Sequence, residues 1–117
     1  MKRKVLGLVE PITIVGKNSN GRITDLKIKA KVDTGASRSS ISKDLVKKLN
    51  LGLYKKTTLV RSALGSERRR LVKAQVSLKG KTMKVFFSVA DRRHLTHRVS
   101  IGQNMLKLGK FLVDPLK

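Results

Sequence analysis

The sequence of 117 residues contains no cysteine and no tryptophan, and it is poor in aromatic and acidic residues. Without cysteine, the chain can form neither a disulfide nor a thiolate metal site. Aromatic residues make up 3% of the sequence, so we expect a core built mostly from aliphatic side chains. No apolar run approaches the length of a membrane span, and the stretch over residues 5–9 is too short for the core of a signal peptide. We therefore expect a soluble, cytoplasmic protein that does not enter a membrane.

The scarcity of acidic residues leaves a large positive charge. Lys and Arg number 28 while Asp and Glu number 7, which gives a formal net charge of +21. Such a field attracts polyanions, among them RNA, DNA, anionic lipids and acidic peptides. The basic residues are spread along the chain, and few aromatic residues are present on which bases could stack. We expect a weak contact with RNA or another polyanion, not specific nucleic-acid recognition.

The length suits a single domain over residues 1–117, and alternation of apolar and polar residues predicts its strands. In the clearest pattern, lysines alternate with apolar residues from Leu26 to Val32. Other strands are predicted over residues 5–15, 39–42, 57–62, 72–78, 83–89, 99–101 and 111–115. One helix is predicted over residues 43–49 with Ser42 as its N-cap, and a second short helix between Gly102 and Gly109. The fold class is therefore mainly β.

The strand that ends at Val32 leads directly into Asp33-Thr34-Gly35, a triplet that occurs once in the sequence. An aspartate, a hydroxyl residue and a glycine at the point where a strand breaks into a turn are the arrangement that aspartic proteases use. Their chemistry needs two carboxylates that share one proton. The same triplet is also a good turn sequence without any function. One triplet per chain therefore indicates either a symmetric dimer or the absence of this chemistry.

Several further segments agree with this motif in their order and spacing. They are residues 32–36, Arg61-Ser62-Ala63-Leu64-Gly65, Ala90-Asp91-Arg92, residues 99–106 and residues 111–115. With these segments the sequence resembles the retropepsin-like aspartic proteases, and most closely a small prokaryotic family whose members are labelled ATP-dependent zinc proteases. The resemblance spans roughly residues 8–115. It implies a closed retropepsin-like β-barrel with one or two short helices that acts as a homodimer.

The resemblance also implies roles for individual residues. Asp33 would be the catalytic residue, and the active-site loop would be supported by Thr34, Gly35, Ala36 and Ser37. A flap would be formed by Ala63, Leu64, Gly65 and Ser66. The segment that packs behind the loop would comprise Ile101, Gly102, Gln103 and Asn104. Gln103 stands where the family usually has arginine, so we expect a weaker brace at this point, because an amide cannot form the charged two-pronged contact of a guanidinium.

The zinc and ATP of the family label have little support in the residues. His94 and His97 are the only histidines, and with Asp91 they could in principle hold a metal ion. No His-Glu-x-x-His motif and no glycine-rich phosphate loop is present, and we interpret the two histidines as surface residues. No metal and no cofactor is predicted.

The sequence thus favours a retropepsin-like aspartic endopeptidase that cleaves polypeptides. The net charge, and the association of the resembled family with ligases that add glutamates to ribosomal proteins, favour acidic or Glu-rich substrates. One alternative is a non-catalytic binding module that uses the retropepsin fold and its basic surface to hold RNA, a ribosome or another polyanion. A further alternative is an adaptor whose charge is incidental. The apolar terminal segments, residues 2–9 and 111–116, are candidates for the dimer interface.

Overall fold

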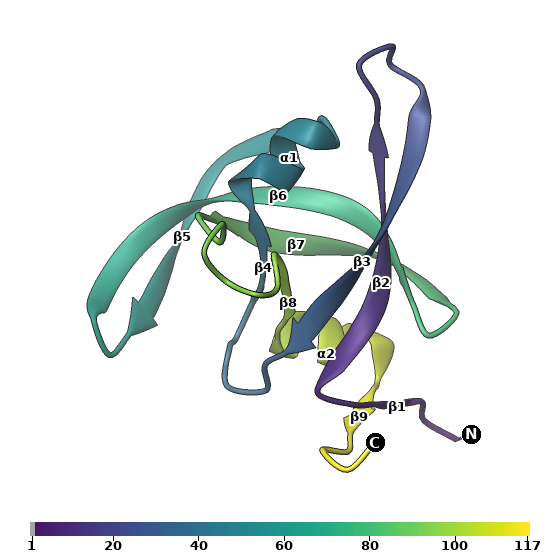
Figure 1. Cartoon of the computed structure of the whole chain (residues 1–117). Helices are drawn as coiled ribbons and strands as arrows, with labels where there is room; N and C mark the ends of the chain where they lie inside the picture. The colour runs from purple at the N-terminus through teal and green to yellow at the C-terminus, as the bar shows by residue number, and fades with distance from the viewer. Residues whose placement is uncertain (1) are drawn as a thin grey trace.

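The computed structural model describes residues 2–117, with the backbone only at Ser62, so Met1 of the predicted domain lies outside the described residues. Its elements are β1 (Val5–Leu6), β2 (Val9–Lys17), β3 (Ile23–Val32), β4 (Ser39–Ser42), α1 (Lys43–Lys48), β5 (Leu53–Ser62), β6 (Gly65–Leu78), β7 (Lys81–Ala90), β8 (Val99–Ile101), α2 (Gln103–Gly109) and β9 (Leu112–Val113). Figure 1 shows strands curling around a common centre, with α1 and α2 at opposite ends. The mainly β class with two short helices is confirmed.

Six strands form a closed ring in the order β2-β3-β8-β4-β7-β6, because β6 pairs back onto β2. The closing pairs join Thr13 to Ser77 and Val15 to Gln75. Among the described residues, strand β5 pairs with β6 alone and lies outside the ring, so the β5–β6 hairpin projects from the barrel (Figure 1). The short strands β1 and β9 form a separate parallel pair. This is the closed barrel that the sequence predicts, with a hairpin arm added to it.

The core is aliphatic, as the scarcity of aromatic residues predicts. Phe87 and Phe111 are its aromatic members, and the remaining buried hydrophobic residues are Leu, Ile, Val, Ala and Met. The alternation that predicts β3 is visible in its burial, because Ala30 and Val32 are buried while the lysines between the apolar positions are exposed. At Pro11 the strand β2 has only β3 beside it, since β6 reaches β2 only over residues 13–15. A proline without an N–H group is tolerated at such a one-sided position.

The single strand predicted over residues 5–15 is wrong, because the chain forms β1 and β2 in two different sheets. The break falls at Gly7, whose N–H donates to Oε2 of Glu10 at 2.6 Å. Glu10 is buried, and its other oxygen lies 3.4 Å from Nζ of Lys79. A buried carboxylate needs such partners, and here they turn the chain between the two strands.

The hairpin arm is longer than predicted. Strand β5 begins at Leu53 rather than at Thr57, and β6 begins at Gly65 rather than at Val72. Alternation does not reveal these extra residues, because most of them are exposed on both faces. Both predicted helices are confirmed, and Ser42 occupies the N-cap position of α1. Its hydroxyl donates to the Asp44 carboxylate instead of accepting a backbone N–H.

Candidate active site

The loop that carries Asp33 begins where β3 ends. The N–H of Asp33 donates to the carbonyl of Ile101 at 2.9 Å, which ties the start of the loop to β8. The Asp33 carboxylate accepts the N–H of Gly35 at 3.0 Å, and the backbone carbonyl of Asp33 accepts the N–H of Ala36 at 3.3 Å. These contacts form a tight turn in which the aspartate side chain replaces a backbone acceptor. Asp33 is exposed and stands at the surface of the barrel.

The segment after β8 braces this loop from behind. The N–H of Gln103 donates to Ala36 O at 2.8 Å, and its side-chain amide donates to Thr34 O at 2.9 Å. The N–H of Asn104 donates to Ser37 O at 3.2 Å. Gln103 therefore makes one side-chain hydrogen bond where the family pattern has a guanidinium, as the sequence predicts for an amide.

Two further contacts make this brace rigid. The Asn104 side chain accepts from both the N–H and the hydroxyl of Ser39, at 2.7 and 2.8 Å, and donates to the carbonyl of Phe86 at 2.9 Å. At Gly102 an added Cβ would lie 2.5 Å from the carbonyl carbon of Arg38. Only glycine allows the two backbones to approach so closely. By contrast, Gly35 has ordinary space around it and no positive φ, so packing within this chain does not require glycine there.

A cavity of about 610 Å³ opens beside Asp33. Its lining comprises Asp33, Gly35, Ala36, Ser37 and Arg38 of the loop, Ser40, Ser88 and Ser100 of the barrel, residues 58–61 and Arg69 of the hairpin arm, and Arg92. The loop and the hairpin, far apart in sequence, thus face each other across one hollow. Four of the lining side chains are arginines, and Asp33 is the one acidic group among the lining residues described.

The hairpin contributes to this cavity through its arm. Residues 58–61 line the hollow, whereas the predicted flap tip, Ala63 to Ser66, does not belong to the described lining. Leu64 at the tip is fully exposed, and Gly65 has a φ of +122°. The wall over Asp33 is therefore formed by residues that the sequence analysis did not assign to the flap.

Thr34 faces another part of the surface. It lines a second hollow of about 400 Å³ together with Arg3, Gln103, Leu106, Lys107, Lys110 and Phe111, and is not part of the lining around Asp33. The supporting role in the active-site loop that the resemblance implies for Thr34 stays a prediction.

The sequence analysis assigned no role to two features of the cavity, the buried serines and Arg92. Ser40, Ser88 and Ser100 are each at most 5% exposed. For Ser100 the available signal was its position between Val99 and Ile101 in a short apolar strand, since a buried hydroxyl needs a partner. Burial lowers the pKa of Arg92, repulsion from Arg69 lowers it further, and the nearby Asp33 raises it.

Neither histidine belongs to the described lining of this cavity. His94 is exposed and His97 is half-buried. Within residues 2–117 no group of three histidine, cysteine or acidic side chains is placed to hold a metal ion. No helix in the described part of the chain is long and apolar enough to cross a membrane.

Comparison with solved structures shows the fold. A protein of unknown function from Legionella pneumophila, Lpg0085, is 18% identical with a TM-score of 0.68, and the match covers 99% of this chain and 96% of that one. EIAV protease in complex with the inhibitor HBY-793 is 23% identical with a TM-score of 0.59, covering 84% and 86%. A retropepsin-like aspartic protease from Rickettsia conorii is 25% identical with a TM-score of 0.50, covering 82% and 86%.

The sequence match extends over most of the chain. The family model described as aspartyl protease matches residues 19–105, which include the Asp33 loop, the hairpin and β8. No curated protein sequence matches this chain. The narrower resemblance to the family labelled ATP-dependent zinc proteases stays a prediction. The fold and the family match together support peptidase function of the aspartic type, and the chain belongs to the aspartyl protease family, in its retropepsin-like form.

Proposed function

We propose that this chain is an aspartic endopeptidase that works as a homodimer. The Asp33 residues of the two copies together activate a single water molecule. The observation that carries the proposal is the position of Asp33, exposed at a cavity of about 610 Å³ beneath the hairpin arm. The described lining contains one carboxylate, and the chemistry requires two. A second copy that faces the first across a two-fold axis supplies the other.

In this mechanism the two carboxylates share one proton, because two close negative charges are unfavourable. The ionised carboxylate takes a proton from the water while the oxygen of the water adds to the peptide carbonyl carbon. The protonated carboxyl gives its proton to the carbonyl oxygen, which forms a neutral tetrahedral intermediate. The C–N bond then breaks as the nitrogen takes the proton that the first carboxylate received from the water. A hydroxyl of the intermediate returns a proton to the second carboxylate as the carbonyl group of the product forms. The hairpin arm excludes bulk water from these steps.

Exposed apolar residues near the chain termini support the dimer. Leu8, Leu112 and Leu116 are 52%, 50% and 95% exposed. Leu112 belongs to β9, while Leu8 follows β1 and Leu116 follows β9 in the sequence. Large apolar side chains exposed around the same pair of strands are consistent with a protein interface there. If the dimer is required, the rate per chain falls at concentrations where sedimentation shows monomers. A rate per chain that is independent of dissociation contradicts the shared site.

Acidic or Glu-rich polypeptides are the proposed substrates. The net charge is +21, and the described lining of the cavity contains four arginines and one aspartate. Charge of one sign accelerates the approach of substrates of the other sign and is screened by salt. Raising the salt concentration should therefore slow cleavage of an acidic peptide more than that of a neutral one. Equal salt dependence for both peptides contradicts this substrate class.

The experiment that tests the proposal is hydrolysis of a mixed peptide library, rich in Glu, from pH 3 to 8. We expect Asp33→Asn to lower the rate by about 10³-fold or more, because it removes the group that moves the proton. Circular dichroism and sedimentation must show that the variant keeps its fold and its oligomeric state. Equal cleavage by the variant contradicts the assignment of Asp33. No cleavage by a wild-type dimer contradicts the enzyme and favours a binding module.

One observation favours a function as a binding module for RNA or another polyanion. Lys27, Lys29 and Lys31 are exposed on the same face of β3, at intervals of about 7 Å. Such a row of ammonium groups suits the backbone of RNA or another polyanion. Replacing all three by Gln should weaken RNA binding and reduce its salt dependence, whereas Asp33→Asn should leave both unchanged. RNA binding that is insensitive to the three lysines contradicts this function.

A further inference from the structure

The cavity beside Asp33 has a polar floor. Ser40, Ser88 and Ser100 come from the neighbouring strands β4, β7 and β8, and all three are buried. The hydroxyls of Ser40 and Ser100 are 2.8 Å apart, and the hydroxyl of Ser88 donates to Ser39 O at 3.4 Å. An apolar side chain placed on this floor would cover polar groups without bonding to them, which is unfavourable. The floor therefore suits a polar side chain of a ligand.

Arg92 lies against this floor. Its Nη1 donates to Oγ of Ser40 at 3.0 Å, and its Nε donates to the carbonyl of His97 at 3.1 Å. A guanidinium has five N–H donors, so these two contacts leave donors available to a ligand. No carboxylate among residues 2–117 lies within ion-pair distance of Arg92, which is half-buried. Arg92 is thus a positive charge, partly withdrawn from water, without an acid of its own.

The surrounding charges make an anion favourable at this point. Arg69, which is paired with Glu67, lines the same cavity from the hairpin arm, and its charge lowers the pKa of Arg92. An anion between the two guanidinium groups would relieve this repulsion and would compensate the burial of Arg92. Asp33 lies close enough to attract Arg92, so such an anion would also lie near the group that activates the water.

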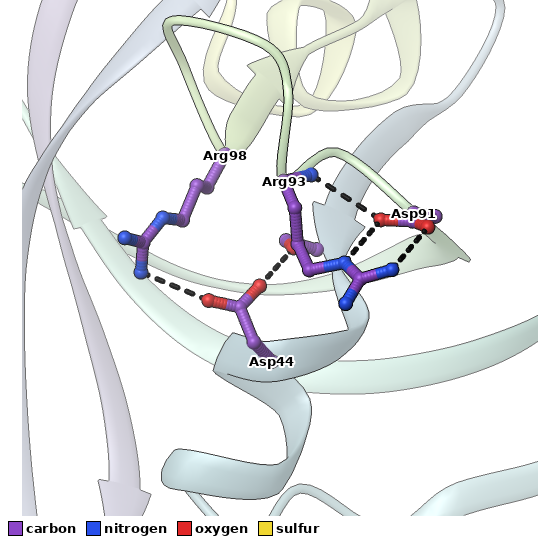
Figure 2. Close-up of polar contacts among 5 residues, drawn as sticks. Asp44, Asp91, Arg93 and Arg98 are labelled. Atoms are coloured by element: carbon purple, nitrogen blue, oxygen red, sulfur yellow. Dashed lines mark hydrogen bonds and ion pairs between the residues drawn. The ribbon is translucent and has the colours of Figure 1, made fainter.

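Ion pairs on either side of Arg92 join parts of the connection that carries it, while its guanidinium is bonded to Ser40 and His97. Figure 2 shows the connection between β7 and β8 above helix α1, with Arg93 turned toward Asp91 and Arg98 toward Asp44. Arg93 contacts both carboxylate oxygens of Asp91 at 3.1 Å, and Arg98 contacts Asp44 at 2.9 Å. A guanidinium held in position before a ligand arrives loses less entropy on binding.

We propose that Arg92, supported by Ser40, determines specificity by binding a carboxylate of the peptide substrate beside the scissile bond. The planar guanidinium recognises the two carboxylate oxygens together. This inference rests on the proposed function, because it places the carboxylate in the same cavity as Asp33. It names a single residue as the main source of the acidic preference, in addition to the field of the whole protein.

The test compares matched peptides that differ only in charge. One peptide contains Glu and the second contains Gln at the same positions, both with acetylated and amidated ends. A third is the Gln peptide with a free carboxyl terminus. We expect wild-type protein to prefer the Glu peptide in kcat/KM, and Arg92→Gln to reduce this preference roughly 10- to 100-fold. If the third peptide is preferred instead of the Glu peptide, the bound group is a terminal carboxylate.

Two further variants separate the local effect from total charge and from the fork geometry. Arg22→Gln removes the same charge at the exposed β2–β3 turn and should leave the preference unchanged. Arg92→Lys keeps the charge without the planar fork and should retain only part of the preference. Equal losses in Arg22→Gln and Arg92→Gln overturn the proposal. A loss of equal size on Glu and Gln peptides in Arg92→Gln also overturns it, because that pattern indicates a structural role.

A binding measurement distinguishes failure of this inference from failure of the proposed enzyme. The Arg92 Nε–H signal can be followed by NMR while the Glu or the Gln peptide is added to Asp33→Asn protein, which needs no turnover. A shift with the Glu peptide alone supports the carboxylate site even if wild-type protein cleaves nothing. Cleavage by wild-type protein without any selective shift or Glu preference overturns the inference and leaves the enzyme intact.

Discussion

The two walls of the cavity are built differently. The loop side is fixed by the backbone of β8 and α2, with Gly102 against Arg38 and Asn104 bonded to Ser39. The hairpin side consists of β5 and β6, where β5 has a single neighbour and Leu64 at the tip is fully exposed. The loop side is therefore positioned by packing, while the hairpin is held by its own strand pairing. Such a difference suits a site with a fixed reactive group and a movable cover. We therefore refer to the loop side as the fixed wall and to the hairpin side as the movable wall.

The largest expected effect is on the fixed wall. Gly102→Val places atoms where the Arg38 backbone lies, and we expect the free energy of unfolding to fall by about 3 kcal/mol. Urea denaturation measures this loss. Gly52→Ala is the matched control, because an added Cβ there meets nothing within 4 Å, and its change should stay within about 1 kcal/mol. Equal stability of the two variants would mean that the close approach is not a constraint.

Asn104→Ala tests the same wall through its hydrogen bonds. The variant leaves the buried Ser39 N–H without its acceptor, so we expect a loss of about 2 kcal/mol in the free energy of unfolding. Asn20→Ala in the exposed β2–β3 turn should change it by less than about 0.5 kcal/mol. Comparable losses in the two variants would show that the Asn104 contacts do not stabilise the loop.

The movable wall should respond locally. Gly65 has a φ of +122°, so Gly65→Ala strains the hairpin by about 1–3 kcal/mol. We expect faster amide hydrogen exchange in β5 and the first part of β6, with little change in β8. Hydrogen exchange followed by mass spectrometry separates these segments. If exchange rises equally in β8, the hairpin opens only together with the barrel and the comparison fails.

The smallest expected effect concerns the connection that carries Arg92. Hydrogen bonds from Arg93 lower the pKa of Asp91 from its ordinary value of 3.8 to about 2. Because the pKa is lower in the folded protein, this contribution is present above about pH 4 and is lost as the pH falls toward 2. Asp91→Asn should therefore lower the thermal midpoint slightly at pH 6, and the gap should close near pH 2. A gap that widens with acid contradicts this sign.

The fixed wall was largely predictable from the sequence, and the movable wall was not. The alternation of β3 predicts that Asp33 follows a strand, because this local pattern reflects strong burial. That residues 101–104 pack behind the loop was implied by the resemblance to the retropepsin-like family. The hairpin arm lacks such a pattern because it is exposed, so neither its length nor its contact with the cavity could be derived.

The polar floor depends on which strands become neighbours. Ser40 and Ser100 meet only because β4 lies beside β8, a pairing that no local pattern specifies. The break at Gly7 likewise depends on the burial of Glu10 beside Lys79, which is distant in sequence. Long-range pairing decided both features, and a single sequence contains no direct signal for it.

The closure of the ring between β2 and β6 also has a consequence for folding. This pairing joins segments that are far apart in sequence, so much of the chain must be ordered before the barrel can close, and such topologies fold slowly. Until closure, β2 presents an unpaired edge that could pair with another chain. The net charge of +21 opposes that encounter, since partly folded chains of like charge repel one another. The charge discussed above as a means of attracting substrates would then also protect the protein from aggregation while it folds.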